Sequence, residues 1–319
     1  MTPGRFLLLD LALLALMILA SRLALVLHEV GGHAVPAKIL GATALEVRLS
    51  PLGGGYVSPT FPKPVGTAGT VVFDLGGIAI NLLTGAAAWF CARRLASRGL
   101  GYVALLFLGV GSVAGALVYL ACGFYYGSGD PVGFAPATED ISHLQGMWIL
   151  FLPAAAAVGW FGPRHFLDFL AGHFSTETAR RRLLATGATV GLAGLAYFGL
   201  WLALRDPRIE GSTRQWRLQR EIAKETIARV QAQAAKPPPP PTAAPAPPPA
   251  QVIVRAEDVV DRIPPPIGPI VLYATFFVAG IASICRAQPT PGNATVRPAV
   301  AVGLAALAGV AVGLFRLFG

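Results

Sequence analysis

Two histidines and a glutamate, His28, Glu29 and His33, lie at the end of the first long apolar run of the chain. Ionisable side chains at membrane depth are costly, and by default they indicate a functional site. Imidazole nitrogens bind Zn²⁺ well, and a neighbouring glutamate can move protons for the water that the metal activates. These residue types predict that His28 and His33 bind zinc and that Glu29 is catalytic. The alternative without metal is a pair of histidines that cap a helix or face water.

The spacing of the histidines requires a distorted helix. Zinc hydrolases usually carry His-Glu-x-x-His, in which residues four apart lie on one helix face. His28 and His33 are five apart, which places them about 140° from each other around an ideal α-helix. A π-bulge absorbs one extra residue, and Gly31 and Gly32 lower its steric cost. We therefore predict a π-bulge or a break at Val30–Gly32 that turns both imidazoles to one side.

The composition is that of an integral membrane protein. Of 319 residues, 54% are hydrophobic and 13% are charged, and the mean hydropathy is +0.61. The net charge of +9 lies mainly between the apolar stretches, which favours contact with anionic lipid and argues against nucleic-acid binding. The three cysteines lack CxxC spacing, so neither a disulfide framework nor a cysteine zinc site is indicated.

The apolar stretches predict an all-α polytopic membrane protein of about six or seven transmembrane helices. The expected spans cover residues 6–37, 68–92, 101–126, 145–161, 183–204, 268–285 and 299–317. After the first span, Leu45, Val47 and Leu49 alternate with other residues before a glycine cluster, which predicts a short β-hairpin. We expect a multi-pass protein in the bilayer of a bacterial inner or plasma membrane.

A zinc site with two histidines needs a third protein ligand and an open position for water. The order of the spans places the His28 end of the first span and the loop after the third on the same side of the membrane. That loop carries Asp130, which is the predicted third ligand, with Asp140, Glu139 or His143 as alternatives. A solvated acidic loop is the interpretation without metal.

Two polar residues, Asp74 and Asn81, lie at membrane depth in the second span. Asn81 is expected to hydrogen-bond a substrate or a transition state, or else to join neighbouring helices.

Several motifs in the first 145 residues resemble the site-2 protease family of intramembrane zinc metalloproteases. They are His28-Glu29-Val30-Gly31-Gly32-His33-Ala34, Lys38-Ile39-Leu40-Gly41-Ala42, Pro51-Leu52-Gly53-Gly54, Gly77-Ile78-Ala79-Ile80-Asn81 and Gly129-Asp130-Pro131. The family typically has HELGHA, an aliphatic-Gly pair, a Leu-Gly-Gly hairpin, Gly-Pro-x-x-Asn and an Asp-Gly ligand motif. This chain carries one extra glycine in the first motif, Ile78 in place of the proline, and Pro131 after the aspartate.

The resemblance implies a zinc metalloprotease that hydrolyses a peptide bond in or near a transmembrane segment. His28, His33 and Asp130 would bind Zn²⁺, Glu29 would be the proton carrier, and the hairpin would hold an unwound membrane protein or peptide as substrate. One alternative is a catalytically inactive relative that acts as a membrane scaffold or binding protein. Another is a transporter or metal-handling protein that uses these acidic and imidazole groups as a relay.

Four regions are expected along the chain. Residues 1–145 form the site-2-protease-like membrane core, residues 146–204 add membrane helices, and residues 268–319 form a helical hairpin in the membrane. Between them, residues 205–267 combine a charged helix with a proline-rich linker. The proline tract 236–250 predicts an extended spacer, and it could also bind a partner.

Overall fold

A computed structural model describes residues 2–133, 141–204, 213–235, 254–289 and 296–318. In this part of the chain, seven helical segments are long and apolar enough to cross a membrane, which confirms the predicted multi-pass helical class. The segments are Pro3–Ile39 (α1, Pro3–Val26; η1, Leu27–Ala34; α2, Val35–Ile39), α3 (Thr67–Arg94), α4 (Leu100–Tyr126), Ser142–Leu170 (α5, Ser142–Gln145; η3, Gly146–Phe151; α6, Leu152–Leu170), Ala179–Leu204 (α7, Ala179–Thr186; η4, Gly187–Gly191; α8, Leu192–Leu204), α10 (Ile267–Arg286) and α11 (Pro298–Phe318).

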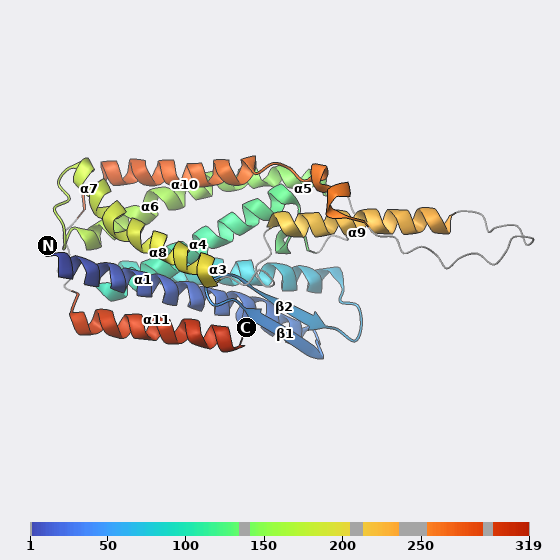
Figure 1. Cartoon of the computed structure of the whole chain (residues 1–319), viewed down its shortest axis with the longest axis horizontal. Helices are drawn as coiled ribbons and strands as arrows, with labels where there is room; N and C mark the ends of the chain where they lie inside the picture. The colour runs from blue at the N-terminus through green and yellow to red at the C-terminus, as the bar shows by residue number, and fades with distance from the viewer. Residues whose placement is uncertain (1, 134–140, 205–212, 236–253, 290–295, 319) are drawn as a thin grey trace, which may run out of the picture.

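Helix α4 lies in the middle of the bundle, with α3, α1 and α6 packed around it (Figure 1). The largest group of buried apolar side chains joins α1, α4 and α6 at the end of the bundle away from the hairpin, and includes Leu13, Tyr102 and Phe169. Helix α10 packs along α6 and α11 packs along α1, on opposite sides of the bundle (Figure 1). The last two spanning helices, α10 and α11, are therefore consecutive in sequence but do not lie side by side. In the described part of this region, the helical hairpin expected for residues 268–319 is not formed.

The fourth span is longer than its apolar stretch suggested. Pro163 lies inside α6, which continues to Leu170, whereas the predicted span ended at residue 161. Proline is tolerated inside transmembrane helices because neighbouring groups can satisfy the backbone positions that it leaves open. Here the helix packs closely on α10, where a methyl group on Gly159 would lie 2.6 Å from the carbonyl oxygen of Phe276.

The predicted β-hairpin is present. Strands β1 (Ala44–Leu49) and β2 (Gly55–Thr60) pair antiparallel, and Leu49 stands opposite Gly55 at the closed end. The alternation of the β1 residues appears as alternating burial along the strand, as expected for a strand with one covered face. The hairpin lies beside the end of α1 (Figure 1).

Arg22 fixes the hairpin turn to α1. It is 4% exposed although it lies inside the first span, and its guanidinium donates to the carbonyl oxygens of Ser50 (2.6 Å) and Gly53 (2.9 Å). The hydroxyl of Tyr197 in α8 donates to the carbonyl oxygen of Leu52 at 3.0 Å. The turn that carries the Leu-Gly-Gly motif is thus bonded at membrane depth to two spanning segments.

We expect Arg22→Met to destabilise the protein by about 2–4 kcal/mol, because it removes two charge-assisted hydrogen bonds from a buried guanidinium to the hairpin turn. Thermal unfolding of the purified protein in detergent measures the effect. Arg5→Met, at an exposed position near the start of α1, is the matched control. Equal melting temperatures for the two variants would contradict the anchoring role of Arg22.

The predicted charged helix is present as α9 (Thr213–Ala234). Arg262 of η6 (Val260–Arg262) donates to Glu225 of α9 at 2.9 Å, which joins this helix to the segment that leads into α10. The proline tract 236–250 lies outside the described residues.

Candidate metal centre

The helix that carries the histidines is a π-helix over Leu27–Ala34, which confirms the predicted distortion. It follows α1 without a break, since Val26 before it and Val35 after it both have right-handed helical dihedral angles. The π-helix accommodates one extra residue in a turn, so the side chains after that residue are rotated relative to those before it. As a result, the rings of His28 and His33 meet with their centroids 4.9 Å apart.

Gly32 has a second role besides easing the π-helix. A methyl group at this position would lie 2.3 Å from the Cα atom of Gly77 in α3, closer than any side chain permits. In the same way, a methyl group on Gly76 would lie 2.0 Å from the carbonyl oxygen of Gly32. The π-helix and α3 therefore touch backbone to backbone, and glycine is required on both sides of the contact.

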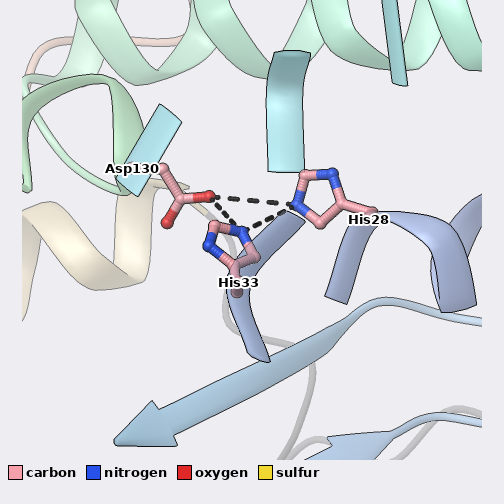
Figure 2. A group of neighbouring side chains, drawn as sticks. All are labelled: His28, His33 and Asp130. Atoms are coloured by element: carbon pink, nitrogen blue, oxygen red, sulfur yellow. Dashed lines mark hydrogen bonds and ion pairs between the residues drawn. The ribbon is translucent and has the colours of Figure 1, made fainter. Parts of the chain in front are cut away.

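Asp130 completes a cluster with the two histidines (Figure 2). The Nε2 atoms of His28 and His33 are 3.3 Å apart. Asp130 Oδ2 lies 3.4 Å from Nε2 of His33 and 3.9 Å from Nε2 of His28. All three ligand atoms lie within 4.8 Å of one another, so the loop after α4 does reach the histidines, as the order of the spans predicted.

Residues of α3 orient both imidazoles. His33 Nδ1 donates to the carbonyl oxygen of Phe73 at 2.7 Å, which leaves the lone pair on Nε2. His28 Nδ1 lies 3.0 Å from Nδ2 of Asn81, while the buried Oδ1 of Asn81 has no hydrogen-bond partner in the described structure. A half-turn of the Asn81 amide exchanges these two atoms. Oδ1 then accepts the Nδ1–H of His28, and Nε2 of His28 also presents a lone pair to the cluster.

The three side chains fit a metal ion. Two lone-pair nitrogens and a carboxylate oxygen repel each other at these distances unless a proton or a metal cation lies among them. Two ligands of tetrahedral zinc, each about 2.0–2.1 Å from the metal, are about 3.3–3.4 Å apart. The separation of the two imidazole nitrogens (3.3 Å) and that of Asp130 from His33 (3.4 Å) match this value, whereas that of Asp130 from His28 (3.9 Å) is longer. Histidine nitrogen and carboxylate oxygen are also ligands that zinc accepts.

Gly77 leaves the space beside these nitrogens open. A methyl group on it would lie 2.5 Å from Nε2 of His33 and 2.6 Å from Nε2 of His28. Gly77 begins the motif that ends at Asn81, and nothing in the sequence indicates that it faces the ligand atoms.

Two glycines and a tyrosine position Asp130. Gly127 ends α4 with a φ of 62° and Gly129 has a φ of 76°, both in the left-handed region that favours glycine. The backbone N–H of Asp130 donates to the hydroxyl of Tyr119 at 3.3 Å. Of the alternative ligands, His143 is exposed in α5 and outside the cluster, whereas Glu139 and Asp140 lie outside the described residues.

A cavity of about 780 Å³ contains the cluster. Glu29 is 4% exposed and lines this cavity with His28, His33 and Asn81, next to Gly55 at the start of β2. Asn81 is thus in place both to orient His28 and to meet a ligand, and substrate binding by Asn81 stays a prediction.

Sequence reasoning missed two aromatic residues of the cavity, Tyr119 and Trp216. The Tyr119 ring lies edge-on to that of His28, with centroids 6.3 Å apart, and edge-on to that of Trp216 in α9, at 6.1 Å. Tyr119 lies in a helix that is apolar along most of its length, and a tyrosine in such a helix does not by itself indicate a functional site. Its spacing of eleven residues before Asp130 was informative only once the turn after α4 was known.

No protein-family model, curated protein or solved structure matches this chain. What the chain does is therefore inferred from the geometry of its own residues.

Proposed function

We propose that this protein is an intramembrane zinc metalloprotease that hydrolyses a peptide bond in or near a transmembrane segment. The observation that carries the proposal is the π-helix, which brings His28 and His33 together with Asp130 in spite of their five-residue spacing. Ionisable side chains at membrane depth are costly, so three metal-binding side chains around one point there indicate a metal site. The resemblance of its motifs to the site-2 protease family points to the same reaction.

Each residue has a role in this proposal. Zn²⁺ held by His28, His33 and Asp130 would act as a Lewis acid that acidifies a water molecule and polarises a peptide carbonyl. Glu29 shares the cavity with these ligands, so its carboxylate would take the proton of the attacking water and give it to the leaving amine. Phe73 keeps the imidazole of His33 in the tautomer that binds metal, and Asn81 would do the same for His28 with its amide turned so that Oδ1 faces Nδ1.

The surroundings also suit a peptide substrate. Gly55, Tyr56 and Val57 of β2 line the cavity beside Glu29. Such a strand can hold an unwound substrate by edge pairing, in which main-chain hydrogen bonds extend the sheet. The expected host membrane, a bacterial inner or plasma membrane, stays a prediction.

Removal of metal tests the proposal. We expect the purified protein to contain about one zinc per chain, as three-ligand catalytic sites do. A chelator should abolish cleavage of a membrane-embedded reporter peptide, and added Zn²⁺ should restore it. Zinc content by elemental analysis and reporter cleavage are measured on the same samples.

Two outcomes would separate this proposal from its alternatives. Stoichiometric zinc without cleavage of any membrane reporter would favour the inactive scaffold. Cleavage that survives complete removal of metal would refute a metalloprotease.

A further inference from the structure

The cavity continues from the metal centre into the membrane-spanning part of the bundle. Both α1 and α4 run toward the metal centre, since η1 follows α1 and Asp130 follows α4. Their facing sides line the cavity away from the metal, and the lining there is mostly apolar. It includes Met17, Ala20 and Ala24 of α1 and Phe107, Gly111, Ser112 and Gly115 of α4, with Ser21, Arg22 and Tyr197 as polar members. We call this part the deep chamber.

The dimensions of the cavity decide what it can hold. The lining of α4 extends from Phe107 to Tyr119, about 18 Å at the helical rise, and that of α1 and η1 from Met17 to His28 is about 16 Å. Over this length the cavity is long enough for about five residues of extended chain at the strand rise.

Missing side chains on α4 make the room. A methyl group on Gly111 or on Gly115 would have no atom within 4 Å, apart from its own helix. The two glycines are four residues apart, so they lie on one face of α4, and Tyr119 continues that face to the metal centre. Because Gly111 and Gly115 have no side chains, the chamber extends to the backbone of α4 at these two positions.

Ser112 provides a polar group in this apolar wall. It is 2% exposed and lines the cavity, and its hydroxyl has no hydrogen-bond partner among the described residues. A buried hydroxyl without a partner is unfavourable. The hydroxyl oxygen is shielded from the cavity as the side chain stands, so it would bond to a peptide group of an extended chain after the side chain rotates to another rotamer. The hydrocarbon of a lipid acyl chain offers neither donor nor acceptor. This favours a peptide over a lipid as the occupant.

We propose that the deep chamber is a substrate subsite that admits an extended apolar segment and selects it by side-chain size. Gly111 and Gly115 set the size limit, and Ser112 hydrogen-bonds the backbone of the segment. The proposal rests on the proposed function in taking a membrane peptide as the substrate, but peptide binding in the chamber can be measured without cleavage.

Cross-linking in a non-cleaving protein tests it. The full chain carries Glu29→Gln, Ala24→Cys as the one thiol, and replacements of Cys91, Cys122 and Cys285 by alanine. The probes are two synthetic membrane-spanning peptides with one cysteine each, one with a central Leu-Leu pair and one with a central Ala-Ala pair, in lipid vesicles. We expect both to form a disulfide with Ala24→Cys. Adding Gly115→Leu should lower cross-linking of the Leu-Leu peptide by about tenfold or more and that of the Ala-Ala peptide much less.

The controls make the result specific. Gly101→Leu adds the same side chain to α4 where nothing lies within 4 Å and outside the cavity lining, and it should leave cross-linking unchanged. Gly111→Leu should repeat the effect of Gly115→Leu, and Ser112→Ala should lower cross-linking of both peptides by about fivefold. Zinc content and melting temperature of each variant show that the fold is kept.

Equal cross-linking with Gly115→Leu and Gly101→Leu would overturn the subsite. So would absence of peptide cross-linking together with labelling of Ala24→Cys by a lipid with a thiol-reactive acyl chain, which would identify lipid as the occupant. If the size dependence holds while the native chain cleaves neither peptide, the subsite stands and the protease proposal fails.

Discussion

Gly77→Ala is expected to lower zinc affinity by about 100-fold or more. Its methyl group would lie 2.5–2.6 Å from the Nε2 atoms of His28 and His33, so it would either fill the place of the metal or push both rings apart. Neither response is available at low cost, because Phe73 and Asn81 fix the rings from the other side. Zinc titration of purified protein measures the effect, and reporter cleavage should fall with it.

Gly101→Ala is the matched control, since it adds the same methyl group to a spanning helix where nothing lies within 4 Å. Helical content and melting temperature in detergent separate loss of metal from loss of fold. A Gly77→Ala protein that folds and binds zinc as tightly as the native chain would disprove the placement of the metal between these two nitrogens.

Glu29→Gln should reduce cleavage by about 10²–10⁴-fold, the usual contribution of a general acid or base, while zinc stays bound. The amide cannot accept a proton, and the proposed ligands His28, His33 and Asp130 remain intact. Asp130→Ala and His28→Ala should lose both zinc and cleavage, because a catalytic site rarely tolerates the loss of one of three protein ligands. Reporter cleavage and elemental analysis on each purified variant provide both measurements.

His143→Ala is the control for a neighbouring titratable group, because this side chain is exposed and outside the cluster. Glu139→Ala and Asp140→Ala are likewise expected to have little effect. Undiminished cleavage by Glu29→Gln would refute the catalytic role of Glu29. Normal zinc in Asp130→Ala, with loss in Asp140→Ala, would transfer the ligand role to Asp140.

The sequence by itself determined the membrane class, the seven spans, the hairpin and the distortion of the helix at His28. These features follow from local physics. A bilayer requires about 20 apolar residues per helical span, and alternation of side chains is the period of a strand. The five-residue spacing left only a rewound helix as a way to bring two imidazoles together. That the loop after α4 reaches the histidines also followed from sequence, because each span carries the chain to the other side of the membrane; the ligand role of Asp130 stays a prediction.

The tertiary structure decided what depends on contacts between distant segments. Hydropathy does not show which neighbour an apolar helix packs against, so the sequence could not predict that α10 and α11 lie apart. It also could not predict that Arg22 bonds to the hairpin turn. The tautomers of the histidines depend on Phe73 and Asn81, forty and fifty-three residues from the rings that they contact. Gly77 and the two glycines of the deep chamber matter because of the open space beside them, and that space exists only after the helices have packed. Tyr119 matters through its contacts with His28, Trp216 and Asp130, which lie on other elements.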